Sequence, residues 1–302
     1  MNSELVCDRA AGALLGLAIG DAVGTTLEFS ARDTQPRLTD MIGGGPFQLP
    51  AGTWTDDTSM ALALADSLIQ RGSLDPHDLM ERFVSWWRCG VYSATGDCFD
   101  IGITTRTALS SFEKNGNPLA GSDDPMSAGN GSLMRLAPIA LWGVRAGEEI
   151  MREAARLQSA TTHAASQCLD ACEGFAVILR AAILGASFED AVSAAEGIGD
   201  VPIRTVLAGG WRGKARAEIR SSGYVAHSLE AALWCVEETS DFREAILLAA
   251  NLGDDADTTA AITGQIAGAL YGREGIPEAW REKVAWGAEI TATAHSLLLG
   301  TA

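Results

Sequence analysis

The sequence predicts an all-α fold, a single compact multi-helix domain over residues 1–302, and three observations carry this prediction. Apolar residues recur at three- and four-residue spacing along most of the chain, as on the buried face of a helix. Glycine, proline or asparagine stands at the ends of these segments, where helices stop. No linker, low-complexity tract or fixed-period repeat interrupts the pattern, which favours one domain.

The expected helices follow this periodicity along the chain. They lie at residues 7–24, 75–90, 104–116, 165–185, 227–240 and 277–300, with two more after the acidic turns near residues 55–58 and 254–259. The glycine-rich stretches 41–52 and 127–132 are expected to be loops, which often carry function.

An apolar run from Ala10 ends at Asp21, and we expect it to be too short for a membrane span. It lacks the basic flank of a signal peptide, so a cytoplasmic location with no membrane partner is expected. The six cysteines show no paired zinc-binding spacing and are expected to be reduced.

The formal net charge of −17 argues against nucleic acid as a partner. Binding to a polyanion needs clustered lysine and arginine, which release the condensed counterions. The same acidity favours cations, although a charged surface also serves solubility. A specific cation site therefore has to be argued from specific residues.

Two acidic turns exceed what helix capping requires. The first places Asp56 and Asp57 between Thr55 and Thr58, directly before an apolar helical pattern. One Ser, Thr or Asp would suffice to cap a helix. Carboxylates and threonine hydroxyls are the oxygen ligands that Mg²⁺ and similar hard ions prefer, and the absence of histidine and cysteine argues against zinc.

The second turn places Asp254, Asp255 and Asp257 before Thr258 and another helix rich in small residues. Each turn taken alone is explained equally well by capping. If the two turns met, like charges about 4 Å apart would repel by roughly 4 kcal/mol per pair at an effective dielectric near 20, and a cation would relieve that. The sequence alone leaves open whether they meet.

Six motifs, in this order, resemble the ADP-ribosylglycohydrolase family, and the pattern is similar to its bacterial branch, which includes the dinitrogen-reductase-activating glycohydrolase. They are GALLGLAIGDAVGTTLEF, GTWTDDTSMAL, DIGITTRTAL, AGNGSLMRLAPIAL, THA and GDDADTTAAITGQIAGA, and they extend from about Gly12 to Gly272. The resemblance implies an all-helical domain with two Mg²⁺ or Mn²⁺ ions in a cleft, removing ADP-ribose from modified side chains.

The resemblance also assigns residue roles. The residues that match the family's metal ligands are Thr55, Asp56, Asp57, Asp255, Asp257 and Thr258. Asp254 falls outside the motif, and capping or support of the ligands is expected of it. Glu28 matches the family's acidic residue beside the metals and is expected to activate or orient the attacking water, as glycoside hydrolysis requires.

Substrate contacts are expected at three places. The loop Gly129, Asn130, Gly131 and Ser132 leaves backbone N–H groups free for a diphosphate, although an Asn-Gly turn between helices explains it without the family match. His163 matches the family's THA motif. The aromatic ring of Tyr224 suits stacking on adenine.

Asp100 is expected both to cap the helix that follows it and to bind the arginine guanidinium of the leaving group, as in arginine-directed relatives. The expected activity is therefore hydrolysis of ADP-ribose N-linked to arginine on a protein or a small conjugate. The alternatives are an O-linked (serine) conjugate hydrolase, a two-metal phosphoesterase, and a non-enzymatic crystallin-like relative.

Overall fold

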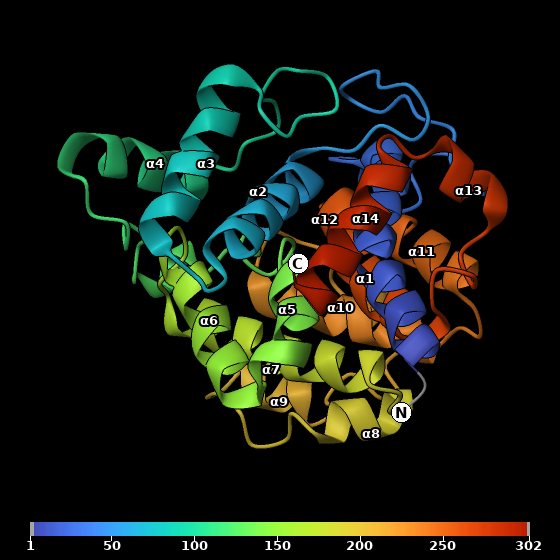
Figure 1. The fold of residues 1–302 in the computed structure, drawn as a ribbon. Coiled ribbons are helices and arrows are strands. Elements are labelled where there is room, and N and C mark those ends of the chain that lie inside the picture. Colours follow the sequence, from blue (N-terminus) through green and yellow to red (C-terminus); the bar gives the residue numbers. More distant parts are fainter. Residues whose placement is uncertain (1–2, 301–302) are drawn as a thin grey trace.

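The computed structural model describes residues 3–300, and the predicted all-α class is confirmed (Figure 1). Within this range the chain forms fourteen α-helices and three short 3₁₀ helices, and it contains no strand. The only β-type pairings there are isolated bridges, at Gly44–Leu49, Ser122–His163 and Gly129–Tyr224.

The helices have the following bounds. They are α1 (Ser3–Gly24), α2 (Asp56–Arg71), α3 (Pro76–Cys89), α4 (Ile103–Asn115), α5 (Ala137–Ala146), α6 (Glu148–Ala160), α7 (Ser166–Ile183), α8 (Phe188–Ser193), α9 (Ile203–Leu207), α10 (Val225–Glu237), α11 (Phe242–Ala250), α12 (Ala256–Tyr271), α13 (Glu278–Lys283) and α14 (Gly287–Leu299). The 3₁₀ helices are η1 (Thr25–Leu27), η2 (Pro125–Ser127) and η3 (Arg216–Glu218).

Local sequence explains where many of these helices begin and end, and α3 is an example. The side chain of Asp75 accepts hydrogen bonds from the N–H groups of His77 and Asp78, and Pro76 occupies the first helical position. Gly90 ends the helix in the left-handed conformation, at φ 67°. An acidic N-cap, an N1 proline and a C-terminal glycine are the expected signals of this arrangement.

The centre of the fold is a close antiparallel pair formed by α1 and α12. Small residues face each other along both helices, at Gly12, Gly16, Gly20 and Gly24 on α1 and at Ala256, Ala260, Gly264 and Gly268 on α12. A Cβ on Gly20 would lie 2.1 Å from the carbonyl oxygen of Ala260, so no larger residue fits. This seam brings the C-terminal end of α1 against the N-terminal end of α12.

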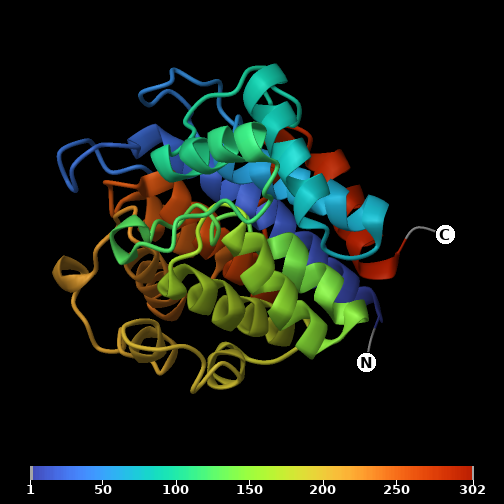
Figure 2. The ribbon, with the colours of Figure 1, turned by 90° about the vertical axis from the view of Figure 1, so that its left-hand side faces the viewer.

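The other helices surround this pair. Helices α7, α10 and α11 pack on α12, and α14 packs on α1 (Figures 1 and 2). Residues Ala10–Gly24 of α1 and Ala256–Ala269 of α12 are buried. Helix α2 contacts α1, α5 and α14, and it carries α3 on its outer side, with α4 against α3. The loops that precede α2, α4, α10 and α12 all contribute residues to one cavity.

Two expectations about helix length are wrong: that the apolar segment at Ala10 is too short to span a membrane, and that residues 277–300 form one helix. Helix α1 is 22 residues long and, with η1, is long and apolar enough to cross a membrane, but 94% of its most apolar window is buried inside the protein. It is apolar because it forms the core. The segment 277–300 is two helices, because Trp286 adopts a left-handed backbone (φ 57°) between α13 and α14.

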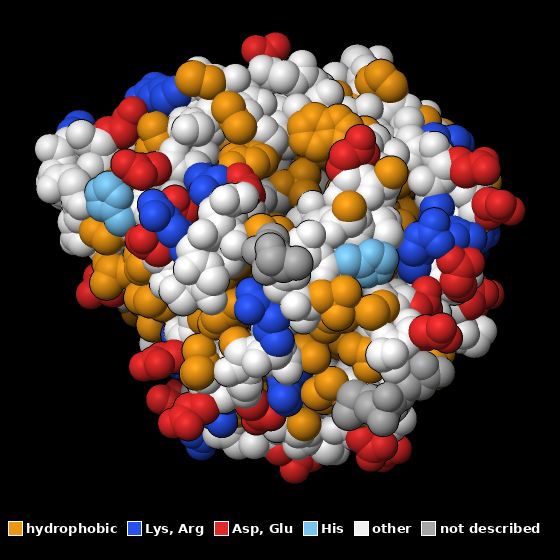
Figure 3. All heavy atoms as spheres, in the orientation of Figure 1, with side chains coloured by type: hydrophobic (Ala, Val, Ile, Leu, Met, Phe, Trp, Pro, Cys, Tyr) orange, Lys and Arg blue, Asp and Glu red, His pale blue; other side chains and the backbone are white. Residues whose placement is uncertain are grey.

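The acidic excess is not concentrated on the face seen in Figure 3, where acidic and basic side chains alternate with apolar ones. Several carboxylates are instead buried, among them Asp21, Glu28, Asp56, Asp57 and Asp257. Charged side chains are rarely buried without a compensating partner, so these residues mark a site. The six cysteines are free thiols, as predicted.

Candidate metal centre and active-site cavity

The site forms where the N-terminal ends of α2 and α12 meet the C-terminal end of α1. The N-terminal end of α2 is capped by Asp21, which belongs to α1. Its Oδ1 accepts from the N–H and hydroxyl of Thr55 (2.8 and 2.9 Å), and its Oδ2 accepts from the N–H and hydroxyl of Thr58 (3.1 and 2.6 Å). Thr55 provides no side-chain cap of its own. Capping therefore does not explain Asp56 and Asp57.

Asp21 was not among the predicted site residues, although the sequence contains a signal for it. It is the only charged residue between Ala10 and Leu27, a run otherwise composed of apolar residues, glycine and threonine. A carboxylate in such a run is buried when the helix is buried, and a buried carboxylate needs donors or a cation.

The second helix end is capped in the same way, by Glu28. Its Oε2 accepts hydrogen bonds from the N–H groups of Ala256 and Asp257, at 2.7 and 3.2 Å. Both donors are unpaired groups in the first turn of α12, where an anion is also favoured by the helix dipole. Glu28 lines the cavity, and its carboxyl also pairs with the side chain of Asp257, in the first turn of α12.

The two acidic turns meet, which resolves the question that the sequence left open. The hydroxyl of Thr55 lies 3.4 Å from Oδ2 of Asp57 and 3.4 Å from Oδ2 of Asp257. Carboxylate oxygens gather in two groups, each within 4.8 Å, and both groups contain Asp257. The first group is Asp21, Asp57 and Asp257; the second is Glu28, Asp255 and Asp257.

Burial and mutual repulsion disfavour the ionised form of these carboxyls. Burial, followed by the charge of Asp257, raises the pKa of Asp21 to about 7, of Glu28 to about 12, of Asp100 to about 9 and of Asp255 to about 6. Such shifts are expected when like charges share a site of low dielectric. Among residues 3–300, no lysine or arginine beside the cluster offsets the charge that these carboxylates carry when ionised, so a bound cation would favour the ionised form.

The residues present fit a divalent cation. Oδ1 of Asp57 is buried and has no hydrogen-bond partner among the described residues, which leaves an acceptor unsatisfied. Burial and the charge of Asp21 raise the pKa of Asp57 well above its usual value, and burial and the charge of Asp100 do the same for the pKa of Asp56. All donors are oxygen atoms, as hard ions such as Mg²⁺ and Mn²⁺ require.

The predicted ligands fall into three sets. Asp57, Asp255 and Asp257 lie in the two oxygen groups, which also include Asp21 and Glu28. Asp56 and Thr258 line the cavity beside them. The hydroxyl of Thr55 instead donates to Asp21 and lies between the two turns. The ligand role of each stays a prediction.

The capping roles expected of Asp100 and Asp254 are wrong. Helix α4 has Gly102 as its N-cap and no side-chain cap. Helix α12 has Asp255 at the N-cap position, while the backbone of Asp254 pairs with Phe29 and Ser30, at 2.8 Å in each direction. The N-terminus of α12 is already satisfied by Glu28, so Asp254 has no cap to provide.

A cavity of about 630 Å³ opens over this cluster, within the range of ligand-binding sites. Three non-glycine residues that line it have left-handed backbones, namely Phe29 (φ 60°), Asp100 (φ 59°) and Asp254 (φ 56°). Such conformations are uncommon for these residues and tend to occur at functional sites. They project side chains from three separate loops toward one space.

The loop 129–132 forms one wall of the cavity, and Asn130 ties it to the acidic cluster. The Asn130 amide donates to Oδ2 of Asp255 at 2.7 Å, and it lies 2.8 Å from the hydroxyl of Ser228. Gly129 and Gly131 line the cavity with Asn130. The expectation of free backbone N–H groups is wrong for Gly129 and Asn130, because these groups donate to the carbonyls of Ser127 (2.7 Å) and Gly223 (3.0 Å). Ser132 does not line the cavity, because it is fully buried and accepts a 2.7 Å hydrogen bond from Ser159.

His163 reaches the cavity from the turn between α6 and α7, and its tautomer is fixed by hydrogen bonds on the side of the ring away from the cavity. Nη2 of Arg135 donates to the hydroxyl oxygen of Thr162 at 2.9 Å. That hydroxyl lies 2.8 Å from Nδ1 of His163, its only acceptor among the described residues. The hydroxyl proton therefore goes to Nδ1, and the ring carries its own proton on Nε2.

His163 is also held neutral. Complete burial and the nearby charge of Arg135 lower the pKa of His163 to about 3. A Cβ on Gly129 would lie 3.3 Å from its Nε2, so the lack of a side chain at Gly129 leaves space there. His163 thus presents an uncharged donor toward the cavity.

Tyr224 stands apart from the cavity lining. It occupies the N-cap position of α10, and its ring packs edge-on against His227 with centroids 4.9 Å apart. Its backbone forms a bridge to Gly129. Stacking of Tyr224 on adenine stays a prediction.

The sequence model of the ADP-ribosylglycohydrolase family matches residues 2–302, so the chain belongs to this family. A solved structure titled "ADP-ribosylglycohydrolase-related protein complex" superimposes with a TM-score of 0.86 and 40% sequence identity, covering 98% of both chains. The expected family and fold are both confirmed. The chain is accordingly a glycohydrolase by family, with an acidic cluster able to hold metal.

Curated relatives narrow the comparison. The ADP-ribosylarginine hydrolase Tri1 of Pseudomonas putida is 48% identical over 98% of this chain and 80% of its own length. The protein of the same name from Serratia proteamaculans is 48% identical over 96% of this chain and 79% of its length. The ADP-ribosyl-[dinitrogen reductase] glycohydrolase of Rhodospirillum rubrum is 32% identical over 94% and 92%.

Proposed function

We propose that this protein hydrolyses the N-glycosidic bond between ADP-ribose and an arginine side chain, with two Mg²⁺ or Mn²⁺ ions at the acidic cluster. The relatives that are 48% identical over nearly the whole chain are named ADP-ribosylarginine hydrolases. The single observation that carries the proposal on the structural side is the meeting of two capped, acidic helix ends below a cavity of about 630 Å³.

The chemistry divides among the chain's own residues. Water adds to the anomeric carbon of the ribose while the bond from that carbon to the arginine nitrogen breaks. A proton leaves the water, and the arginine nitrogen gains one, so the products are ADP-ribose and free arginine. Bound divalent cations would orient the ribose hydroxyls and lower the pKa of the water.

Glu28 is the residue suited to take the water proton. Its Oε2 is fixed by two backbone N–H groups, which hold the carboxylate in one orientation. Its carboxyl lines the cavity, where a water could reach it, and bound cations would lower its raised pKa so that it could accept a proton. A positioned base of this kind typically contributes a factor of about 10²–10⁴ in rate.

The remaining groups bind and orient substrate. Gly131 offers its backbone toward the cavity, and neutral His163 offers an Nε2–H donor for an oxygen of ADP-ribose. Asp100, which lines the cavity beside Asp257, accepts from the guanidinium. A carboxylate binds this planar fork in two hydrogen bonds, a geometry that a serine leaving group cannot use.

The linkage is tested by release of ADP-ribose from matched arginine-linked and serine-linked peptides. We expect the wild type to prefer the arginine linkage. Asp100→Asn, which removes no helix cap, should keep its melting temperature while losing about tenfold or more in arginine-linked turnover. A preference for the serine linkage, or unchanged arginine-linked turnover in Asp100→Asn, would contradict the proposal.

A further inference from the structure

A second cavity lies beside the active-site cavity, and the two share no lining residue. Its volume is about 330 Å³, and it lies between the segment 27–37, helix α11 and η3. Two residues that line this second cavity are chain neighbours of residues that line the active-site cavity. Ser30 follows Phe29, and Gly253 precedes Asp254. A ligand bound there would contact the back of the segment that carries Glu28.

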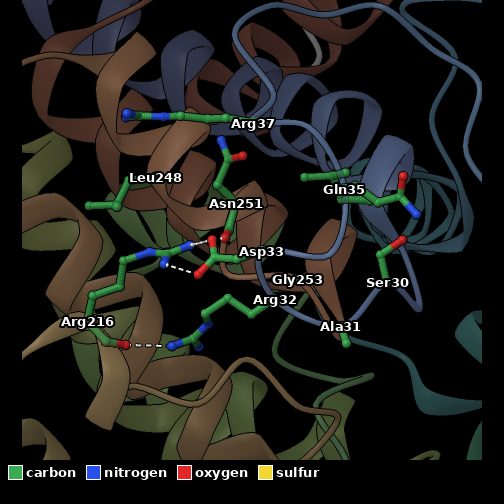
Figure 4. Close-up of a pocket in the computed structure, with 11 residues that line it drawn as sticks. Ser30, Ala31, Arg32, Asp33, Gln35, Arg37, Arg216, Leu248, Asn251 and Gly253 are labelled. Carbon is green, nitrogen blue, oxygen red and sulfur yellow. Dashed lines mark hydrogen bonds and ion pairs between the residues drawn. The ribbon is translucent and has the colours of Figure 1, made fainter.

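Three arginines line this second cavity, in a chain whose net charge is −17. Figure 4 shows Arg37 extended along one side, with Arg216 and Arg32 on the other and Asp33 between them. Asp33 is the only carboxylate among the lining residues. The cavity is therefore locally positive in an otherwise acidic protein.

The hydrogen bonds of Arg32 and Arg216 leave donors unused. Arg32 donates from Nε, Nη1 and Nη2 to the carbonyl oxygens of Leu252, Arg216 and Ile219. Arg216 forms a two-bond fork with Asp33, at 2.8 Å for each bond, and donates once more to the carbonyl of Asn251. A guanidinium has five N–H donors, so each retains two.

The positive charge is not fully neutralised either. The pKa of Arg32 is lowered by burial and by the neighbouring charge of Arg216, which means that the two guanidiniums repel each other. Arg37 is exposed and has no hydrogen-bond or ion-pair partner among residues 3–300. All five of its donors are available.

We propose that this cavity, which we call the arginine pocket, binds a phosphate group. Guanidinium donors that approach from three different side chains match a tetrahedral oxyanion with several terminal oxygens. A planar carboxylate is already accommodated by Arg216, in the form of Asp33. Leu27 and Leu248 give the pocket apolar walls, which suit the organic part of a phosphate monoester.

The test is calorimetric titration of the full-length protein with inorganic phosphate, in Mg²⁺ buffer at low ionic strength. Mg²⁺ keeps the acidic cluster in the same state for every variant. We expect Arg37→Ala to weaken phosphate binding about tenfold or more, because charge-assisted hydrogen bonds are lost. Arg37 is exposed and makes no hydrogen bond or ion pair with residues 3–300, so this variant should fold normally.

A second variant should change the affinity in the opposite direction. Asp33→Asn removes the carboxylate that occupies Arg216, so phosphate should bind several-fold more tightly. Asparagine tolerates the left-handed backbone of Asp33 (φ 61°), so the local fold should persist. Arg204→Ala is the matched control, because it removes an exposed arginine outside the pocket and should leave phosphate binding unchanged.

Glycerol phosphate, titrated in parallel, identifies the form of the ligand. Tighter binding than inorganic phosphate supports an organic phosphate ester as the occupant, and equal or weaker binding supports free phosphate. Either conclusion holds only if Arg37→Ala weakens the binding of the titrated ligand. Phosphate that does not bind the wild type at millimolar concentration, or that binds Arg37→Ala as well as wild type, overturns the proposal.

Discussion

The N-terminal ends of α2 and α12 are built on one plan but use their capping carboxylates differently. Each end is capped from outside its own helix, α2 by Asp21 and α12 by Glu28. Asp21 receives two hydrogen bonds on each of its oxygens. Glu28 receives both of its bonds on Oε2 alone.

This difference gives Asp21 a structural role and Glu28 a chemical one. Asp21 is saturated by protein donors and therefore holds α1 and α2 in place. Glu28 lines the cavity, and burial with the charge of Asp257 raises its pKa to about 12, against about 7 for Asp21. At that pKa the carboxyl is protonated at neutral pH. The positive charge of bound divalent cations would lower the pKa of Glu28, and the carboxylate could then accept a proton from water.

The largest expected effect is on turnover in Glu28→Gln. The amide oxygen of glutamine still accepts from Ala256 and Asp257, so the cap and the melting temperature should be retained. Because the amide cannot take a proton from water, kcat should fall by about 10²-fold or more. The measurement is ADP-ribose release under saturating substrate, and turnover equal to wild type would remove Glu28 from the mechanism.

The largest expected effect on stability is in Asp21→Asn. An amide nitrogen facing the N–H of Thr58 or Thr55 cannot accept, so at least one first-turn donor of α2 loses its partner in a buried place. We expect a loss of about 1–3 kcal/mol in the free energy of unfolding. Urea denaturation measures it, and a loss no larger than that of Glu28→Gln would contradict the assigned difference between the two caps.

A smaller and opposite effect is expected for Asp57→Asn in metal-free protein. Asp57 caps nothing, and its amide would donate to neighbouring carboxylates, so stability should stay the same or rise by up to about 1 kcal/mol. Affinity for Mg²⁺ should nevertheless fall. Thermal denaturation with and without Mg²⁺ separates the two effects, and a strong loss without metal would restore the capping explanation.

Near neutral pH the smallest expected effect is the pH dependence contributed by His163. Its pKa is about 3 when folded and 6.5 in an ordinary environment, so the unfolded chain binds more protons between these values. The contribution to stability is complete above pH 6.5 and is lost as pH falls from 6.5 toward 3, at up to about 1.4 kcal/mol per pH unit.

The accompanying tautomer is directly measurable. The ¹⁵N spectrum of the His163 ring should show the Nε2–H form and no titration between pH 5 and 8. Thr162→Val removes the hydroxyl that donates to Nδ1 and should mix the tautomers. A ring that titrates near pH 6.5 in the wild type would show that Arg135 and Thr162 do not control it.

Much of the fold could be predicted from the sequence because its signals are local. Asp75, Pro76 and Gly90 delimit α3 by chemistry within a few residues. The break at Trp286 could not be predicted in this way, because the apolar periodicity continues across it. Its left-handed backbone depends on packing, where the ring contacts Trp54 with centroids 5.1 Å apart.

The site was predictable in its acidic turns but not in how they are joined. The turns are brought together by the close pairing of α1 and α12, through glycines from Gly12 to Gly24 and small residues from Ala256 to Gly268. The four-residue spacing within each helix does not say which other helix it packs against. Asp21 was missed because a carboxylate inside an apolar helix has no local capping pattern. The caps it provides are to residues more than thirty positions away.

The most direct test of the account is the anomalous scattering of a crystal of the protein grown with Mn²⁺. We predict two peaks about 4 Å apart, one against Asp57 and the other against Asp255, with Asp257 touching both. A map with no peak between the starts of α2 and α12 would contradict the claim that these helix ends form a two-metal centre.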